Sequence, residues 1–313
     1  MNGGVKMQDR TKQGLVLEPL PGAFGVRAVG VDLTCADDAL SRSLADALFQ
    51  NRILVVPGQA MSNDQYVAFG KRWGRPVLLV SRRNRHGEHP EMIVQSNSGS
   101  APAFMRNVAS HWHCDSSYED EVATVTMLLG VKAPAEGGET LFADLVAAYA
   151  TLPKDMRDRI DGLQVRHGIS AATPGKDETI VRPQDLPEDM QRHVDIPAPV
   201  LHPLVRTHPV TGMKALYGLG GSAFAVEGMD EAEGLALLDD LKSHATAPIF
   251  VQDYKLMPGD VLLWDNLSVM HRATPIEYSD APDKARLNYR ISVKGLPDFL
   301  AASENQLIEP ASK

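Results

Sequence analysis

The chain has 313 residues, a formal net charge of −9 and a hydrophobic content of 43%. This length and apolar content suit a globular protein with a sizeable core. The acidic balance, without a dense cluster of lysine and arginine, excludes the basic footprint of a nucleic-acid-binding surface. No stretch approaches the roughly 18 consecutive apolar residues of a membrane span, and the N-terminus lacks the apolar segment of a signal peptide.

The cysteine content and the chain ends suggest a simple organisation. Cys35 and Cys114 are the two cysteines, so no disulfide framework is implied and a reducing compartment fits. We therefore expect a soluble, cytoplasmic protein. No linker, repeat or low-complexity tract divides the chain, so we expect a single domain over residues 1–313, with its core at about 17–300 and loose tails at 1–13 and 302–313.

The first part of the chain predicts alternating strands and helices. Leu40, Leu44 and Leu48 recur on one face of a helical repeat. Ser62 is followed three residues later by Gln65, which is the pattern of a helix-capping box. The predicted elements are a strand over 24–33, a helix over 37–51, a buried strand over 53–56, a helix from Ser62 and a core strand over 124–129.

The second part of the chain continues with helices, a hairpin and late strands. Leu235, Leu238 and Leu241 are expected to face the core from one helix. The predicted elements are helices over 144–152, 153–163 and 229–244, a hairpin over 201–219 interrupted at 209–212, and strands over 261–264 and 288–293. Because regular βαβ units are absent from this pattern, it supports a mixed α/β fold and no particular topology.

The most informative motif is the segment His111-Trp112-His113-Cys114-Asp115, read together with the distant His271. On an extended strand, residues two apart point to the same face, so His113 and Asp115 could approach one metal ion. With His271 they would form the set of two histidines and one carboxylate that is typical of non-heme Fe(II) oxygenases. Cys114 would point to the opposite face, as a small buried residue rather than a ligand.

A second metal pairing remains open at this point. His111 and His113 could bind a metal together with Glu119, as in cupin-type oxygenases that do not use 2-oxoglutarate. The spacing to Glu119 is longer than usual for a cupin site, so the set of His113, Asp115 and His271 is the better fit.

Several further motifs occur in order along the chain, and together they resemble the family of taurine dioxygenase and 2,4-dichlorophenoxyacetate dioxygenase (TauD/TfdA). The resemblance extends roughly from Leu17 to Lys294. It rests on Leu20-Pro21-Gly22-Ala23-Phe24-Gly25, Val29-Gly30-Val31-Asp32-Leu33, Trp112-His113-Cys114-Asp115, Gly137-Gly138-Glu139-Thr140, His208-Pro209-Val210-Thr211-Gly212, Trp264-Asp265-Asn266 and His271-Arg272-Ala273.

The resemblance implies a fold, cofactors and site residues. The fold would be a double-stranded β-helix (jelly-roll) core buttressed by helices. Fe(II) would be bound by His113, Asp115 and His271. Thr140 and Arg286 would contact the distal carboxylate of the cosubstrate 2-oxoglutarate, and Arg290 would contact an anionic group of the substrate. The alternative for Arg290 is a structural ion pair with a nearby carboxylate, Asp115 or Glu139 being candidates.

The function implied is that of an Fe(II)/2-oxoglutarate-dependent dioxygenase. Such an enzyme uses O2 to hydroxylate or oxidatively cleave a small anionic substrate, a carboxylate, sulfonate or sulfate, and releases succinate and CO2. The alternative from another class is a catalytically inactive binding protein on the same fold. His86 is a further candidate for substrate contact, although a histidine in such a loop is more often structural. Relatives are commonly dimers or tetramers, so a homo-oligomer is expected.

Overall fold

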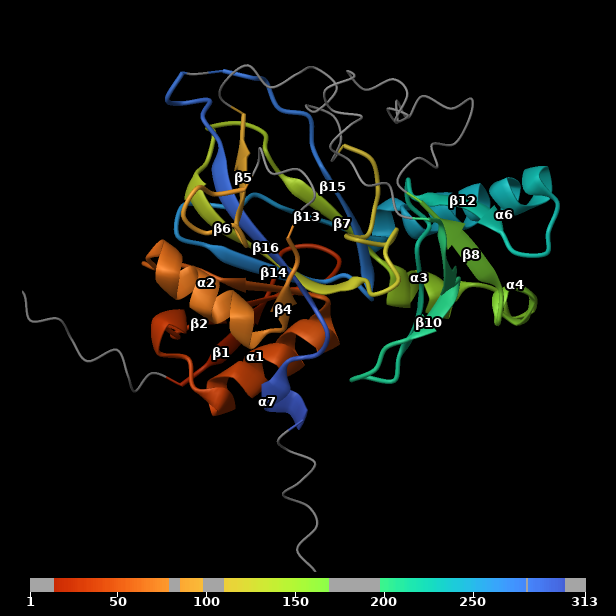
Figure 1. Ribbon diagram of the computed structural model, residues 1–313, viewed down its shortest axis with the longest axis horizontal. Helices are drawn as coiled ribbons and strands as arrows, with labels where there is room; N and C mark the ends of the chain where they lie inside the picture. The colour runs from red at the N-terminus through yellow and green to blue at the C-terminus, as the bar shows by residue number, and fades with distance from the viewer. Residues whose placement is uncertain (1–13, 79–84, 98–109, 169–197, 280, 302–313) are drawn as a thin grey trace, which may run out of the picture.

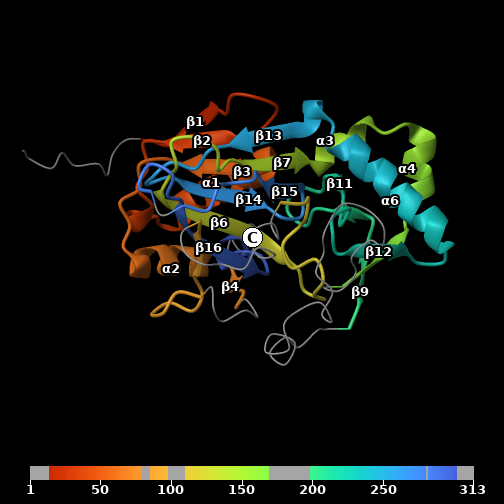
Figure 2. The same cartoon turned by 90° about the horizontal axis from the view of Figure 1, so that it is seen from above.

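The computed structural model describes residues 14–78, 85–97, 110–168, 198–279 and 281–301. Its core is a larger and a smaller β-sheet packed face to face (Figures 1 and 2). The strands of the larger sheet follow the order β1 (Val16–Pro19), β2 (Val26–Val29), β3 (Ile53–Val56), β14 (Val261–Asp265), β6 (Ala123–Lys132), β16 (Leu287–Lys294) and β4 (Arg75–Pro76), and β5 (Ile93–Ser96) also pairs with β16.

The smaller sheet has the order β13 (Val251–Tyr254), β7 (Thr140–Asp144) and β15 (Val269–Ala273). Both of its pairings are antiparallel, and in the larger sheet only β2 and β3 run parallel among the described pairs. Successive strands pass between the two sheets, from β6 to β7 and from β14 to β15 and back to β16. The fold is therefore a jelly roll with added helices, as expected from the sequence.

Strand β14 shows how the core is divided by the larger sheet. Leu262 and Trp264 are buried in the cluster that also contains Phe142 of the smaller sheet. Val261 and Leu263 are buried on the opposite face, in the cluster formed with the N-terminal helices. Because successive side chains of a strand point to opposite faces, one short apolar run serves two cores. Burying one apolar side chain of this size completely contributes about 1.5–3 kcal/mol to the free energy of folding.

The helices lie outside the two sheets. Figure 1 shows α1 (Asp38–Asn51), α2 (Asn63–Arg72) and α7 (Asp298–Ala301) grouped on one side of the larger sheet. At the opposite end, α3 (Leu145–Thr151), α4 (Lys154–Ile160) and α6 (Glu231–Ala245) pack with two small sheets. Those sheets are β12 (Ala223–Val226), β8 (Gln164–His167) and β9 (Val200–Pro203), and the hairpin of β10 (Val205–Thr207) and β11 (Lys214–Leu216). Within the described residues, two short 3-10 helices are also present, η2 (Leu33–Cys35) and η6 (Pro248–Phe250).

Most predicted elements are present, with differences at three places. The strand expected over 24–33 is shorter, since only 26–29 pair and a 3-10 turn follows. The hairpin expected over 201–219 is limited to β10 and β11, because β9 pairs with β8 instead. In α6, Leu237 takes the buried position expected for Leu235, which is only half-buried.

Two further expectations concern the chain ends and membrane-spanning segments. The tails expected at 1–13 and 302–313 lie outside the described residues. Within the described ranges, no helix is long and apolar enough to span a membrane.

Candidate metal centre

The two histidines of the predicted triad are opposite each other on neighbouring backbone segments. His271 lies in β15, and an isolated antiparallel bridge pairs it with His113. Each backbone N–H donates to the carbonyl of the other residue, at 3.0 Å from His113 and 2.9 Å from His271. Directly opposed residues carry their side chains on the same face of a ladder. The ring centroids are accordingly 4.3 Å apart.

Asp115 reaches these rings from a turn. The sequence predicted an extended strand through His113 and Asp115, but only His113 is in a bridge and Asp115 begins a turn. Ser116 follows with a φ of 56°, so the chain reverses immediately after the carboxylate. Asp115 Oδ1 still lies 3.8 Å from the Nε2 atoms of both His113 and His271. The three candidate ligand atoms all lie within 4.8 Å of one another.

Cys114 faces away from this cluster, as its position between two ligands predicted. The side chain is 3% exposed, and its Sγ lies 3.4 Å from the carbonyl oxygen of Val269. Burial raises the pKa of the Cys114 thiol to about 12. Because metals bind the thiolate, a thiol with a raised pKa on the far face is no ligand.

The protonation states of the triad suit a metal ion. Burial opposes the charged form of Asp115, but the charge of Arg290, together with His271, His113 and a hydrogen bond from Thr126, holds the pKa of this carboxyl below its ordinary value. Burial lowers the pKa of His271 to about 3, with a further contribution from His113. The site therefore offers a carboxylate and a neutral imidazole, the forms in which these side chains bind metals.

The tautomer of His113 is fixed by its backbone neighbour. Its Nδ1 lies 2.8 Å from the carbonyl oxygen of His111, which can only accept a hydrogen bond. Nδ1 therefore donates this hydrogen bond, and Nε2 is the ring nitrogen that lies near Asp115. Metal-binding histidines are commonly oriented by such a hydrogen bond from the other ring nitrogen.

Arg286 and Thr140 belong to two segments that meet at Gly138. A Cβ atom placed on Gly138 would lie 3.6 Å from Arg286 Cδ, so this guanidinium side chain passes over the segment that leads to Thr140. Thr140 is half-buried at the start of β7, and Arg286 immediately precedes β16. Arg286 is therefore close to the segment that carries Thr140. Of the two candidate arginines, only Arg290 lies within strand β16.

Arg290 lies in the middle of β16 and is close to Asp115 of the candidate triad. Its Nη2 atom is 3.5 Å from Asp115 Oδ1. The side chain is 19% exposed, and its Nε atom has no hydrogen-bond partner in the described part of the chain. The ion pair with Asp115, which was the structural alternative for this residue, is therefore present, while part of the guanidinium remains free to bind another group.

His86 is engaged by its own loop. Its Nδ1 accepts hydrogen bonds from the backbone N–H groups of Glu88 and His89, both at 3.3 Å. The ring packs edge-on against Tyr289 at 5.6 Å, and Nε2 lies 3.4 Å from the side chain of Asn63. These contacts hold the ring in its loop, and His86 is not part of the triad.

The cupin-type pairing is not supported by the geometry. Glu119 forms an ion pair with Lys294, the last residue of β16. Among the described residues, the one group of potential metal ligands that meets in space contains neither His111 nor Glu119. The alternative that was open in the sequence is therefore not favoured.

The structure adds two side chains that sequence reasoning missed. Thr126 of β6 donates a hydrogen bond to Asp115 Oδ2 at 2.6 Å. Asn266, in the turn between β14 and β15, donates to Thr126 Oγ1 at 2.9 Å. The Trp264-Asp265-Asn266 motif drew attention to this turn, but nothing in the sequence indicated that β6 would lie beside it.

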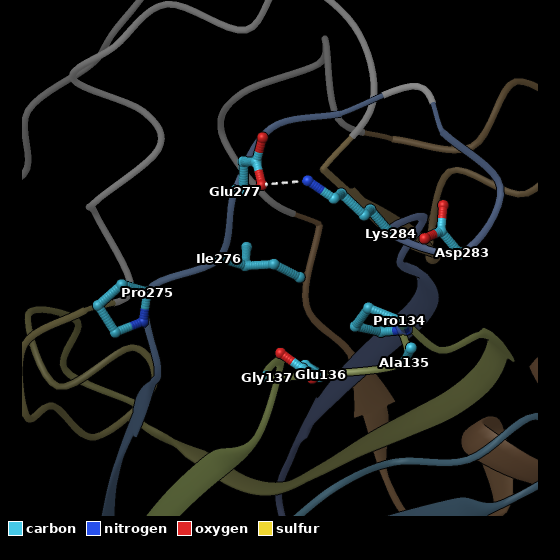
Figure 3. A pocket seen from close by; sticks show the side chains of 9 residues that line it. All are labelled: Pro134, Ala135, Glu136, Gly137, Pro275, Ile276, Glu277, Asp283 and Lys284. Atoms are coloured by element: carbon cyan, nitrogen blue, oxygen red, sulfur yellow. Dashed lines mark hydrogen bonds and ion pairs between the residues drawn. The ribbon is translucent and has the colours of Figure 1, made fainter.

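A surface pocket of about 520 Å³ opens next to the segment of Gly138 (Figure 3). Pro134 lines the pocket, and a Cβ atom placed on Gly138 would lie 3.1 Å from Pro134 and 3.6 Å from Arg286 Cδ. Figure 3 shows Lys284 directed at Glu277 across the pocket, and these two form an ion pair of 2.7 Å. None of the lining residues belongs to the triad, and the pocket is lined by Gly137 and Lys284, which are near Gly138 and Arg286 in the chain.

Gly220 permits the close approach that places His113. A Cβ atom at this position would lie 2.3 Å from the carbonyl oxygen of Trp112 and 2.7 Å from the Cα of His113. Both contacts are with backbone, which cannot move aside without displacing the ligand. Overpacking of this kind typically lowers the free energy of unfolding by about 1–3 kcal/mol.

Gly220→Ala is therefore expected to lower both the thermal unfolding temperature and the affinity for Co(II), used as a spectroscopic probe of the metal site. Gly87→Ala is the matched control, because nothing lies within 4 Å of its Cβ position. Thermal melts and anaerobic Co(II) titration check both variants. A Gly220→Ala protein that is as stable and binds Co(II) as tightly as the wild type would contradict this account.

The family model "Taurine catabolism dioxygenase TauD, TfdA family" matches residues 17–291. The chain belongs to this family. The TauD/TfdA resemblance predicted from the sequence motifs is thereby confirmed, and the chain is placed among the α-ketoglutarate-dependent dioxygenases, which are oxidoreductases.

Individual TauD/TfdA relatives resemble most of the chain. The (S)-phenoxypropionate/alpha-ketoglutarate-dioxygenase of Sphingobium herbicidovorans is 32% identical over 83% of this chain and 89% of its own length. The alpha-ketoglutarate-dependent 2,4-dichlorophenoxyacetate dioxygenase of Cupriavidus pinatubonensis is 32% identical over 85% of this chain and 94% of its own. The solved structure of a taurine dioxygenase from Burkholderia xenovorans superposes with a TM-score of 0.70 at 29% identity, covering 90% of this chain and 91% of that one.

Proposed function

We propose that this protein is an Fe(II)/2-oxoglutarate-dependent dioxygenase that hydroxylates or oxidatively cleaves a small anionic substrate. The observation that carries the proposal is the cluster of His113, Asp115 and His271, whose ligand atoms face one another within 4.8 Å. Three protein ligands of this kind leave coordination positions open for other molecules. Fe(II) in such a site would supply the redox chemistry by which O2 is reduced.

The donor set fits iron on its chemistry. Two imidazole nitrogens and one carboxylate oxygen suit Fe(II), and the aspartate distinguishes the site from halogenases, which lack the carboxylate ligand. His271 Nε2 and His113 Nε2 are both directed at Asp115 Oδ1, so a cation between them would contact all three. We propose these three residues as the iron ligands.

We propose that Arg286 and Thr140 bind the distal carboxylate of 2-oxoglutarate. Arg286 is half-buried and has no ion-pair partner within the described ranges, and its buried Nε atom has no hydrogen-bond partner among the same residues. A buried charge without a partner is costly, so a bound carboxylate would stabilise it. An arginine suits this task because its planar fork donates two parallel hydrogen bonds.

We propose that Arg290 recognises the anionic group of the substrate. In the structure its charge balances that of Asp115, at 3.5 Å. A divalent cation held by Asp115 would provide the same compensation, and the guanidinium could then pair with a second anion. Phenoxypropionate and 2,4-dichlorophenoxyacetate, named for the relatives, are carboxylates, and taurine is a sulfonate.

The experiment that tests the function supplies Fe(II), O2, ascorbate and 2-oxoglutarate with a panel of aryloxyalkanoates, sulfonates and sulfate esters. Succinate release that depends on one member of the panel is the expected result. Oxidation of a substrate without succinate would indicate the cupin-type chemistry, and the absence of both reactions would indicate a binding protein. Succinate release with an uncharged substrate only would remove the role of Arg290.

Arg290→Ala is expected to impair substrate use more than cosubstrate use. Losing a hydrogen-bonded charge typically costs about 1.5–3 kcal/mol, or roughly 10-fold to 150-fold in the substrate concentration at half-maximal rate. Substrate-independent decarboxylation of 2-oxoglutarate should fall much less. Both rates are measured from succinate release, with and without substrate.

The matched control for Arg290→Ala is Arg166→Ala, which removes an exposed arginine paired with Glu227 on the surface. It should leave both rates as in the wild type. If Arg290→Ala reduces the two rates equally, the ion pair with Asp115 is the main role of Arg290, and the substrate assignment is wrong.

Two proposals on organisation accompany this function. The family match over residues 17–291 supports one catalytic domain that extends over the described core. We also propose a homo-oligomer, on the expectation from the family resemblance, and size-exclusion chromatography with light scattering measures its mass.

A further inference from the structure

The two oxygen atoms of Asp115 have different surroundings. Oδ1 lies 3.8 Å from both histidine Nε2 atoms, on the side where a metal would bind. Oδ2 points the other way and accepts the hydrogen bond from Thr126 Oγ1, at 2.6 Å. Asp115 and Thr126 are both buried, at 4% and 0% exposure, so water does not compete for this bond. The short distance is typical of a hydroxyl donating to a charged carboxylate.

The direction of this hydrogen bond is set by a tryptophan. The indole N–H of Trp264 can only donate, and it lies 3.0 Å from Asn266 Oδ1, which fixes the orientation of the carboxamide. The NH2 group of Asn266 is therefore directed at Thr126 Oγ1, which accepts at 2.9 Å. Ser292 Oγ is a neutral neighbour of the same hydroxyl at 2.9 Å, whereas Asp115 Oδ2 is nearer and charged. The single hydroxyl hydrogen of Thr126 is therefore donated to Asp115 Oδ2.

The same network also holds the backbone of the ligand loop. Asn266 Oδ1 accepts a second hydrogen bond from the backbone N–H of Asp115, at 3.4 Å. The Trp264 ring in turn packs against His271, with centroids 4.7 Å apart. Thr126 and Asn266 therefore connect two of the three ligands, although neither touches the position between them.

We propose that Thr126 is a positioning residue that restricts Asp115 to binding the metal through Oδ1. This inference rests on the proposed metal site. A carboxylate can use one or both oxygens toward a metal, and using both would occupy an additional coordination position. With Oδ2 engaged by Thr126, Asp115 cannot rotate to present both oxygens without breaking a buried, charge-assisted hydrogen bond. The open positions that the chemistry needs are thereby preserved.

Thr126→Val tests the role, because valine keeps the shape of threonine and removes the hydroxyl. Thr124→Val is the matched control: Thr124 is on the same strand, is 8% exposed, and its hydroxyl bonds the carbonyls of Val293 and Gly295 rather than a ligand. The probe is Co(II) under anaerobic conditions, whose visible absorption reports coordination number and affinity without turnover. Loss of a residue that orients a ligand typically weakens metal binding by about 10-fold to 100-fold.

We expect Thr126→Val to weaken Co(II) binding by about that factor and to change the visible spectrum. Thr124→Val should retain the wild-type affinity and spectrum. Thr126→Ser keeps the hydroxyl and should also retain both, which provides a test even if the valine variant fails to fold.

Three results would overturn the inference. An unchanged spectrum and affinity in Thr126→Val would show that the hydroxyl does not position Asp115. An equal loss in Thr124→Val would show a general effect of the strand, and a loss of tenfold or more in Thr126→Ser would show that packing alone is at work. If the wild-type protein itself binds no Co(II), the proposed metal site fails as well, so the two failures are distinguishable.

Discussion

Alanine in place of His113 or His271 is expected to abolish 2-oxoglutarate-dependent succinate formation. Each histidine would supply one of the three proposed ligands, and Asp115 Oδ1 lies 3.8 Å from both Nε2 atoms, so removing either one would leave a two-ligand site. A metal held by the remaining pair would be bound weakly and would lose its fixed orientation. Anaerobic titration with Fe(II) or Co(II), followed by succinate measurement, checks affinity and activity separately.

His111→Ala is the matched control for both variants. It removes an imidazole two residues from His113, and His111 lies outside the ligand cluster. We expect it to retain metal binding, with His113 held by the same backbone carbonyl at 2.8 Å. If His111→Ala and Glu119→Gln lose the metal while His271→Ala retains it, the cupin-type pairing is correct and the present ligand assignment is wrong.

The elements that follow from local rules were predicted well from the sequence. The capping box of Ser62 and Gln65 forms as expected, with both reciprocal hydrogen bonds present. The apolar run of β3 is buried at all four positions. In both cases neighbouring residues determine the outcome, so no knowledge of the rest of the chain is needed.

The meeting of His113, Asp115 and His271 in space could be predicted because these candidate ligands lie in recognisable motifs. The triad follows from the spacing of His113 and Asp115 and from the family resemblance, which adds His271. The backbone conformation at His113 and Asp115 could not be predicted from this spacing, because an extended strand and a turn can both direct the two side chains to one point. The turn depends on Ser116, whose backbone has a positive φ of 56°. Serine is not a residue type that strongly indicates this conformation.

The support around Asp115 could not have been predicted from the sequence. It depends on the register of two strands, in which Thr126 lies opposite Trp264. A shift by one residue would turn Thr126 to the other face of the sheet. Since the register of distant strands is set by the packing of the whole core, short-range patterns contain no signal for it. Residues that orient ligands are therefore harder to predict than the ligands themselves.

Arg286→Ala is expected to raise the 2-oxoglutarate concentration needed for half-maximal activity strongly. Burial lowers the pKa of Arg286, while Tyr278 acts in the opposite direction, and an arginine remains charged at neutral pH. Truncating one partner of a buried, hydrogen-bonded charge pair typically costs about 2–5 kcal/mol, which corresponds to roughly 30-fold to several-thousand-fold in affinity. Thr140→Val should act in the same direction with a smaller effect, since it removes one neutral hydroxyl.

The measurement is 2-oxoglutarate binding to the metal-loaded protein under anaerobic conditions, by calorimetry, together with the concentration dependence of succinate release. Arg286→Lys should also bind 2-oxoglutarate poorly, because a point charge does not replace the planar fork of the guanidinium. Arg166→Ala, the exposed control, should match the wild type. If Arg290→Ala weakens 2-oxoglutarate binding and Arg286→Ala does not, the two arginines have exchanged roles. The guanidinium beside Asp115 would then hold the cosubstrate, and the substrate would have to find its partner at Arg286, next to Gly138 and the surface pocket.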